Sequence, residues 1–185
     1  MGRDEDVIAE LTADHREVDG LLERIDAVPP GDPERKRLVD RLTAELVRHS
    51  VTEEEYLYPS VREHVEHGNA LADEELAEHA RIEGLLKDLE RRGADDPAFD
   101  GLVSRLAEEV RAHLLDEERR LFTLLRAACG EETLARLGER LRRARKTAPA
   151  WPHPAAPHTP LAGTVLTPGT GLVDRAREAL GGRAG

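Results

Sequence analysis

The sequence predicts an all-α protein, folded as an antiparallel up-down-up-down four-helix bundle with a short fifth helix and an irregular C-terminal tail. Leu, Ala, Glu and Arg recur at spacings of three and four residues through the first 145 positions, which is the periodicity of amphipathic helices. Aromatic residues make up only 3% of the chain, and strictly alternating apolar runs are absent, so strands are not expected. Short loops between long helices favour an antiparallel bundle.

The helices are expected in four long amphipathic stretches, over roughly residues 5–28, 34–66, 71–91 and 98–128. The segments VPPGDP, HGNA and RGADDP separate them, because Gly and Pro interrupt helices. Gly130 ends the fourth stretch, and EETLARLGERLRRARK predicts the fifth helix, with a basic end. We therefore assign residues 1–145 to the bundle.

Residues 146–185 differ in composition and form a separate tail. TAPAWPHPAAPHTPLAGTVLTPGTG is rich in Pro, Thr, Ala and Gly, which predicts a flexible linker, and LVDRAREAL has the pattern of a short terminal helix. Trp151 and nearby apolar residues provide a means of docking on the bundle or on a partner protein that the sequence does not identify.

Charge and cysteine content restrict the class of partner. The chain has 38 acidic and 27 basic residues and a net charge of -11, the wrong sign for binding nucleic acid or an anionic membrane surface. No run approaches the roughly 20 apolar residues of a membrane span. The single Cys129 cannot form an internal disulfide, and MGRDEDVIAELTADH lacks the features of a signal peptide. We predict a cytoplasmic protein.

The chain contains an internal repeat with an offset of 64 residues. Without a gap, ADHREVDGLLERI aligns with AEHARIEGLLKDL, DPERKRLVDRL with DPAFDGLVSRL, and HSVTEEEYLY with HLLDEERRLF. His49 matches His113, and Glu53 matches Glu117. Two copies indicate a duplicated helical hairpin with a pseudo-twofold axis, because a solenoid needs three or more units.

Four histidines, His15, His49, His79 and His113, fall on the predicted core faces of the four long helices. Within each hairpin the two histidines are 34 residues apart, and the Asp-Pro turn lies about midway between them. All four should therefore meet in one layer at the centre of the bundle. A single histidine on an apolar face is usually a core residue, but four at matched positions favour a common site.

Carboxylates accompany these histidines at a spacing of four residues. Glu53 and Glu117 follow the histidines of the second and fourth helices, and ionised carboxylates are almost never fully buried unless paired or bound to metal. Glu83 and Asp19 follow the histidines of the third and first helices, and either is a candidate ligand or an acceptor for an imidazole N–H. The remaining histidines, His64, His67, His153 and His158, are expected at the surface or in the tail.

This donor set has more nitrogen and oxygen atoms than one tetrahedral ion uses, and it contains no thiolate. It fits a pair of first-row transition metals, with iron as the best candidate and a single zinc or manganese ion as the weaker alternative. Glu53 and Glu117 would bridge the two ions, and the imidazoles would be terminal ligands.

The series His15, His49-x-x-x-Glu53, His79 and His113-x-x-x-Glu117 resembles the cation-binding signature of the hemerythrin-like (HHE) family, over about residues 5–128. The segments EEEYLYP and DEERRLF also resemble the consensus that follows each histidine. The resemblance implies a non-haem, oxygen- or carboxylate-bridged di-iron centre. With Glu83 added from its spacing, the predicted metal residues are His15, His49, Glu53, His79, Glu83, His113 and Glu117.

Members of this family carry oxygen, sense oxygen or iron, or handle peroxide or nitric oxide. The oxygen carriers have a second histidine four residues after the one on the third helix, and here that position is Glu83. An extra carboxylate stabilises ferric iron, which favours redox turnover or iron sequestration over oxygen carriage. Tyr56 is expected on the same stripe as Glu53, either as a ferric ligand or as a core aromatic, and its repeat counterpart is Arg120.

Two functions follow from these observations. The first is a di-iron protein that handles oxygen, peroxide or nitric oxide in a redox or stress-response role, with turnover as an open question. The alternative is a non-catalytic protein that binds oxygen, sequesters iron or senses it.

Overall fold

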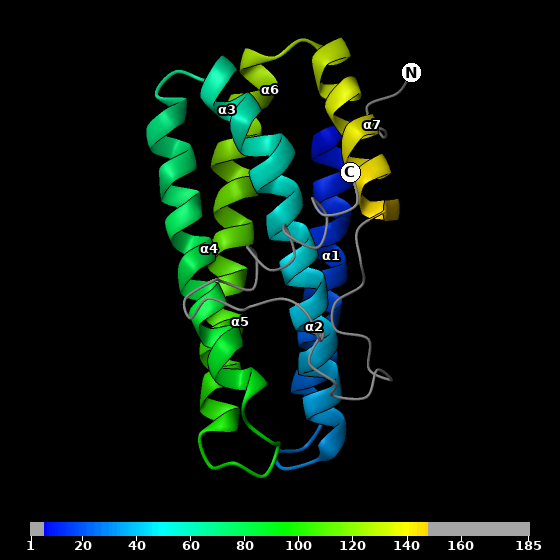
Figure 1. Ribbon diagram of the computed structural model, residues 1–185, viewed down its shortest axis with the longest axis vertical. Helices are drawn as coiled ribbons and strands as arrows, with labels where there is room; N and C mark the ends of the chain where they lie inside the picture. The colour runs from blue at the N-terminus through cyan, green and yellow to red at the C-terminus, as the bar shows by residue number, and fades with distance from the viewer. Residues whose placement is uncertain (1–5, 148–185) are drawn as a thin grey trace, which may run out of the picture.

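The computed structural model describes residues 6–147, and within them helices are the only regular secondary structure (Figure 1). None of the helices in this part of the chain combines the length and the apolar character needed to cross a membrane. The tail predicted after residue 145 lies outside the described residues, apart from the end of the last helix.

Four antiparallel rods and a fifth helix make up the fold (Figure 1). The first and third rods are α1 (Val7–Asp26) and α4 (Gly68–Glu90). The second rod consists of α2 (Pro33–Thr52), a π-helical turn η2 (Glu53–Leu57) and α3 (Tyr58–His64). The fourth repeats it with α5 (Phe99–Asp116), η3 (Glu117–Leu121) and α6 (Phe122–Ala128), and α7 (Glu131–Thr147) is the fifth helix. The predicted bundle is confirmed.

The two Asp-Pro turns are alike in detail, as the repeat predicts. The side chain of Asp32 accepts a hydrogen bond from the backbone N–H of Glu34 at 2.8 Å, and Asp96 accepts one from Ala98 at 2.8 Å. Both turns lie at the same end of the bundle, at the bottom of Figure 1. Each half of the repeat is therefore a helical hairpin with the same Asp side-chain bond in its turn, although Asp32 caps α2 directly whereas α5 begins only at Phe99.

The connection between the hairpins lies at the opposite end and requires Gly68. A Cβ atom at this position would lie 2.1 Å from the carbonyl oxygen of Val61, so any side chain would collide with α3. His67 precedes it with a φ of 59°, and both His67 and His64 are exposed, as predicted.

The apolar core consists of two clusters with a polar layer between them. The larger cluster fills the half of the bundle toward the Asp-Pro turns, and the smaller fills the half toward α3, α6 and α7. The fifth helix contributes Leu134, Leu137 and Leu141 to the smaller cluster. The polar layer is thus enclosed by apolar side chains along the bundle axis on both sides.

Candidate metal centre

The polar layer contains four histidines and three glutamates from all four rods. Each of these side chains is at most 4% exposed. They are His15, His49, Glu53, Glu75, His79, His113 and Glu117. The histidines predicted to meet at one level therefore do so.

Glu53 lies between histidines of the two hairpins. Its Oε1 is 3.2 Å from the Nε2 of His49 on the same rod, and its Oε2 is 3.3 Å from the Nε2 of His79 on α4. One carboxylate thus presents an oxygen to each hairpin, as a bridging ligand does.

Glu117 lies between histidines of both hairpins on the fourth rod, but with one oxygen toward both. Its Oε2 lies 3.4 Å from the Nε2 of His15 and 3.7 Å from the Nε2 of His113. The two glutamates are related by the 64-residue repeat, so the pseudo-twofold axis passes between them.

The Nδ1 atoms of the histidines face outward, toward a second group of carboxylates. His15 Nδ1 lies 2.9 Å from Glu118 Oε1, and His79 Nδ1 lies 3.3 Å from Glu54 Oε1. These two acids are repeat counterparts on the π-helical turns. A carboxylate at Nδ1 fixes the ring and directs the Nε2 lone pair inward, which is how protein sites prepare a histidine for metal.

The other two histidines face acids of the neighbouring helix. His113 Nδ1 is 3.1 Å from Glu78 Oε2, whereas His49 Nδ1 is 3.9 Å from Asp14 Oδ2, which exceeds hydrogen-bond distance. The two acids again correspond in the repeat.

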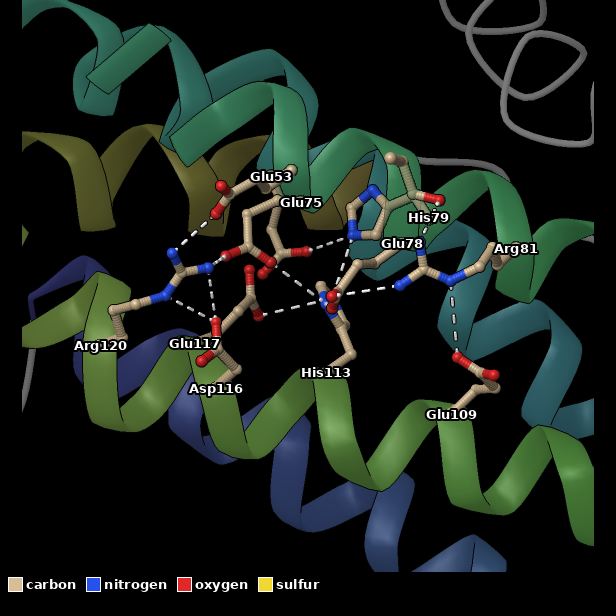
Figure 2. Close-up of polar contacts among 12 residues, drawn as sticks. Glu53, Glu75, Glu78, His79, Arg81, Glu109, His113, Asp116, Glu117 and Arg120 are labelled. Carbon is tan, nitrogen blue, oxygen red and sulfur yellow. Dashed lines mark hydrogen bonds and ion pairs between the residues drawn. The ribbon is translucent and has the colours of Figure 1, made fainter. Parts of the chain in front are cut away.

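Glu75 makes the two halves of the cluster unequal, because its repeat counterpart is Leu11. Its Oε2 lies 3.3 Å from His113 Nδ1, and its Oε1 lies 3.3 Å from the guanidinium of Arg120. Figure 2 shows Glu75 between these two side chains, above Glu117. The half that contains His79 and His113 therefore has one more carboxylate than the other half.

The two halves of the cluster also differ at Tyr58, whose repeat counterpart is Phe122. The buried hydroxyl of Tyr58 lies 3.0 Å from His79 Nε2 and donates to Glu117 Oε1 at 3.3 Å. In the other half, the ring of Phe122 stacks on that of His15 with centroids 5.5 Å apart.

The prediction that Tyr56 points toward the cluster is wrong, because the helix widens at Glu53. The N–H of Tyr58 donates to the carbonyl of Glu53, five residues back, so this turn contains one extra residue and rotates Tyr58 inward. Tyr56 instead donates to Glu55 at the surface and lies under Arg140. The alignment of Tyr58 with the apolar Phe122 was the sequence signal for its inward position.

The structure brings six of the seven predicted metal residues together, but not Glu83. Glu83 is half-buried and pairs with Lys87 at 2.8 Å, while Asp19 is exposed. On the second and fourth rods the glutamate of the cluster lies four residues after the histidine. On α4, which runs antiparallel to them, this order is reversed. The residue that reaches the level of Glu117 therefore lies four positions before His79, and it is Glu75.

The groups of the metal-free cluster have strongly shifted pKa values. Burial raises the pKa of Glu53 well above its usual range, and the neighbouring Glu117 adds to this. Burial opposes ionisation of Glu117 as well, but the nearby histidines, His113 first, lower its pKa below the usual range. Burial lowers the pKa of His49 to about 4. It also opposes protonation of His113, but Glu117 and other acids outweigh it and raise that pKa well above its usual value.

Several inward-facing atoms of the cluster have no hydrogen-bond partner among the described residues. They are Nε2 of His15 and His49, both carboxylate oxygens of Glu53, and Oε2 of Glu117; Oε2 of Glu75, beside His113 Nδ1, has none either. Unpaired buried polar atoms are costly, so a cation among them would relieve the penalty.

Three sets of donor atoms lie within 4.8 Å of one another, as the ligands of one ion do. The first set is His15, His49, Glu53 and Glu117, the second Glu53, His79 and His113, and the third Glu75, His113 and Glu117. The shared glutamates join the three sets into one site, and its nitrogen and oxygen donors fit first-row transition metals.

Comparisons with known proteins agree with this geometry. Residues 6–125 match the hemerythrin HHE cation-binding domain, and this match includes the whole cluster. An uncharacterized hemerythrin-like protein of Schizosaccharomyces pombe is 26% identical over 166 residues, which cover 89% of this chain and 81% of that protein. A DNA nickase of Nostoc sp. is 28% identical over 117 residues, 63% of this chain but 32% of the nickase. The crystal structure of a hemerythrin HHE cation-binding domain-containing protein from Mycobacterium kansasii superposes with a TM-score of 0.67 and 25% identity, over 77% of this chain and 89% of that chain.

Proposed function

Because this chain belongs to the hemerythrin HHE cation-binding family, we propose that it is a non-haem di-iron protein that handles oxygen, peroxide or nitric oxide in a redox or stress-response role. The observation that carries the proposal is the cluster of buried, inward-facing imidazole and carboxylate atoms without hydrogen-bond partners among the described residues. Its two halves share Glu53 and Glu117, which suits a pair of ions better than one.

The residues divide between two metal positions. His15 and His49 would hold one ion, His79, His113 and Glu75 the other, and Glu53 and Glu117 would be shared. When bound, two iron ions supply one-electron redox chemistry toward small oxidants. The half with fewer protein donors leaves more of its coordination sphere to an external ligand, so we assign ligand binding to the side of His15 and His49.

The surroundings of this half restrict what can reach it. A surface cavity of about 440 Å³ between α1 and the fourth rod is lined by Phe122 and Glu118, both of which contact His15. Every group of the cluster is at most 4% exposed, so the site favours small ligands over large substrates. Phe122 and the buried Leu11 stand in place of the polar Tyr58 and Glu75 of the other half, so the proposed ligand side is more apolar.

The alternative is a non-catalytic protein that binds oxygen, sequesters iron or senses it. The same burial favours it, because a closed site suits retention of a metal as well as turnover of a small ligand. We do not carry over the activity named for the Nostoc relative, since a chain with a net charge of -11 is poorly suited to DNA. A cytoplasmic location stays a prediction from the sequence.

Metal analysis and stopped-flow spectroscopy test the proposal. We expect about two iron ions per chain and an optical spectrum that changes when hydrogen peroxide or nitric oxide is added, repeatedly if turnover occurs. Reversible oxygen binding without turnover would instead support the non-catalytic alternative. One equivalent of zinc or manganese and no iron would contradict a di-iron site. A His113→Ala variant loaded in the same way provides the background for each reaction.

A further inference from the structure

His49 is the only one of the four clustered histidines whose Nδ1 lacks a close carboxylate. In the other three, the distance from Nδ1 to the nearest outer acid is between 2.9 and 3.3 Å. For His49 the distance to Asp14 Oδ2 is 3.9 Å, and its Nδ1 has no hydrogen-bond partner among the described residues. Among the four contacts between Nδ1 and an outer acid, this is the one that departs from the pseudo-twofold repeat.

Arg145 of the fifth helix contacts the same carboxylate. Its guanidinium forms a close ion pair with Asp14 Oδ1, and Asp14 is itself 7% exposed. The fifth helix has no counterpart in the repeat, so nothing equivalent acts by symmetry on the other half. Asp14, His49 and Arg145 also line one small cavity of about 10 Å³, together with Glu17, Glu45 and Arg48.

Glu78, the repeat counterpart of Asp14, shows that one carboxylate can contact an arginine and a histidine at the same time. Glu78 contacts Arg81 at 3.2 Å through one oxygen and His113 at 3.1 Å through the other. Glu has one more methylene group than Asp, and this extra reach lets Glu78 hold both partners. With the shorter Asp14, the pair with Arg145 is made and the bond to His49 is not.

We propose that Arg145 is a positioning residue that holds Asp14 away from His49 and so weakens the metal position formed by His15 and His49. A carboxylate at Nδ1 orients a ligating imidazole and raises its basicity, and losing such a partner typically lowers metal affinity by about 10- to 100-fold. The fifth helix thereby makes one ion of the pair easier to release or exchange than the other. This inference rests on the metal site proposed above.

The test compares metal binding by the full chain before and after Arg145→Gln, with Zn²⁺ as the probe in competition with a chromophoric chelator. We expect the weaker of two binding steps to tighten by about tenfold, because Asp14 becomes free to bond to His49. A purely structural role for Arg145 predicts the opposite sign, since loss of helix packing would loosen the site. Arg143→Gln is the matched control, because Arg143 lies on the same helix and pairs with the exposed Glu139.

Further variants separate positioning from other effects. Arg81→Gln should give no gain, because Glu78 already contacts His113. Adding Asp14→Asn to Arg145→Gln should abolish the gain, and Asp14→Glu should produce it with Arg145 in place. Asp14→Glu also serves if Arg145→Gln disturbs the fold, as circular dichroism would reveal.

A readout independent of metal is the imidazole N–H signal of His49 in the metal-free protein by nuclear magnetic resonance. It should move downfield in Arg145→Gln and Asp14→Glu, as a new bond to a carboxylate requires. An unmoved signal together with unchanged or weaker zinc binding in both variants overturns the role of Arg145. If the His49 signal moves as expected in the two variants but the wild-type protein binds no metal at the cluster, the result contradicts only the proposed function.

Discussion

The carboxylate of Glu53 lies 3.3 Å from the Nε2 of His79, a residue of the other hairpin. The contact spans the interface between the two halves of the repeat, and Glu117 makes the symmetric contact to His15 at 3.4 Å. The cluster therefore exists only when both hairpins are packed together. Binding of a cation there would stabilise the assembled bundle, because the unfolded chain has no preformed site.

Replacing Glu53 or Glu117 by Ala should remove at least half of the bound iron and leave most of the helix content. Each glutamate serves both metal positions, while the two apolar clusters hold the bundle independently. Metal analysis and circular dichroism check the two parts. Glu55→Ala is the matched control, because Glu55 lies on the same π-helical turn but is exposed. Full iron occupancy in both variants would contradict the role of these carboxylates.

Glu75→Leu should weaken metal binding at the His79 and His113 half by at least about tenfold, because it gives this half the apolar residue that Leu11 provides in the other. Glu83→Leu, four residues after His79 instead of four before, should leave binding unchanged. Chelator competition measures both. Equal losses in the two variants would show that α4 presents a different face to the metals.

Tyr58→Phe should lower the free energy of unfolding of the metal-free protein by about 1–2 kcal/mol, because the buried Glu117 Oε1 loses its hydrogen-bond donor. The change imitates Phe122, so the ring is accommodated. Tyr56→Phe removes a hydroxyl at the surface and should change the value by less than about 0.5 kcal/mol. Urea unfolding at pH 7 measures both, and equal effects would argue against an inward position for Tyr58 alone.

The metal-free protein should become less stable as the pH rises above about 6.5. The pKa values of Glu53 and His113 are raised in the folded state, so the folded protein keeps protons that the unfolded chain has lost. Each such group lowers the free energy of unfolding by up to about 1.4 kcal/mol per pH unit until its folded pKa is reached. His49 acts in the opposite sense, but only between its folded pKa of about 4 and the ordinary value of 6.5.

Urea midpoints at pH 6.5 and 8.5 check this dependence. The metal-loaded protein should not show the decline, because the metal replaces the protons and binds more tightly as they leave. A metal-free midpoint that rises with pH would mean that Glu53 and His113 do not retain protons in the fold.

Metal loading should also raise the stability at neutral pH. A ligand at 100 times its dissociation constant stabilises the folded state by about 2.7 kcal/mol, and two ions add their effects if they bind independently. Thermal unfolding of metal-free and iron-loaded protein measures the difference. Equal melting temperatures would argue against a buried site.

The periodicity of the chain was enough to predict the bundle, its loops and the fifth helix. The 64-residue repeat and the positions of His15, His49, His79 and His113 predicted one level for the histidines, because antiparallel rods meet at equal distances from their turn. These features depend on local patterns and on counting along the chain, so they can be predicted without knowledge of the packing.

Only the tertiary structure determined which other side chains complete the layer. Because α2 and α4 are antiparallel, Glu75 and not Glu83 lies in the cluster. A residue that follows His49 lies level with a residue that precedes His79. A wide helical turn selected Tyr58 over Tyr56, which a constant rotation of 100° per residue cannot anticipate. The pairing of Arg145 with Asp14 depends on where the fifth helix packs, outside the repeat. The sequence by itself determined the number and level of the clustered histidines, whereas relative direction, helical phase and packing decided the acids, the phenol and the arginine around them.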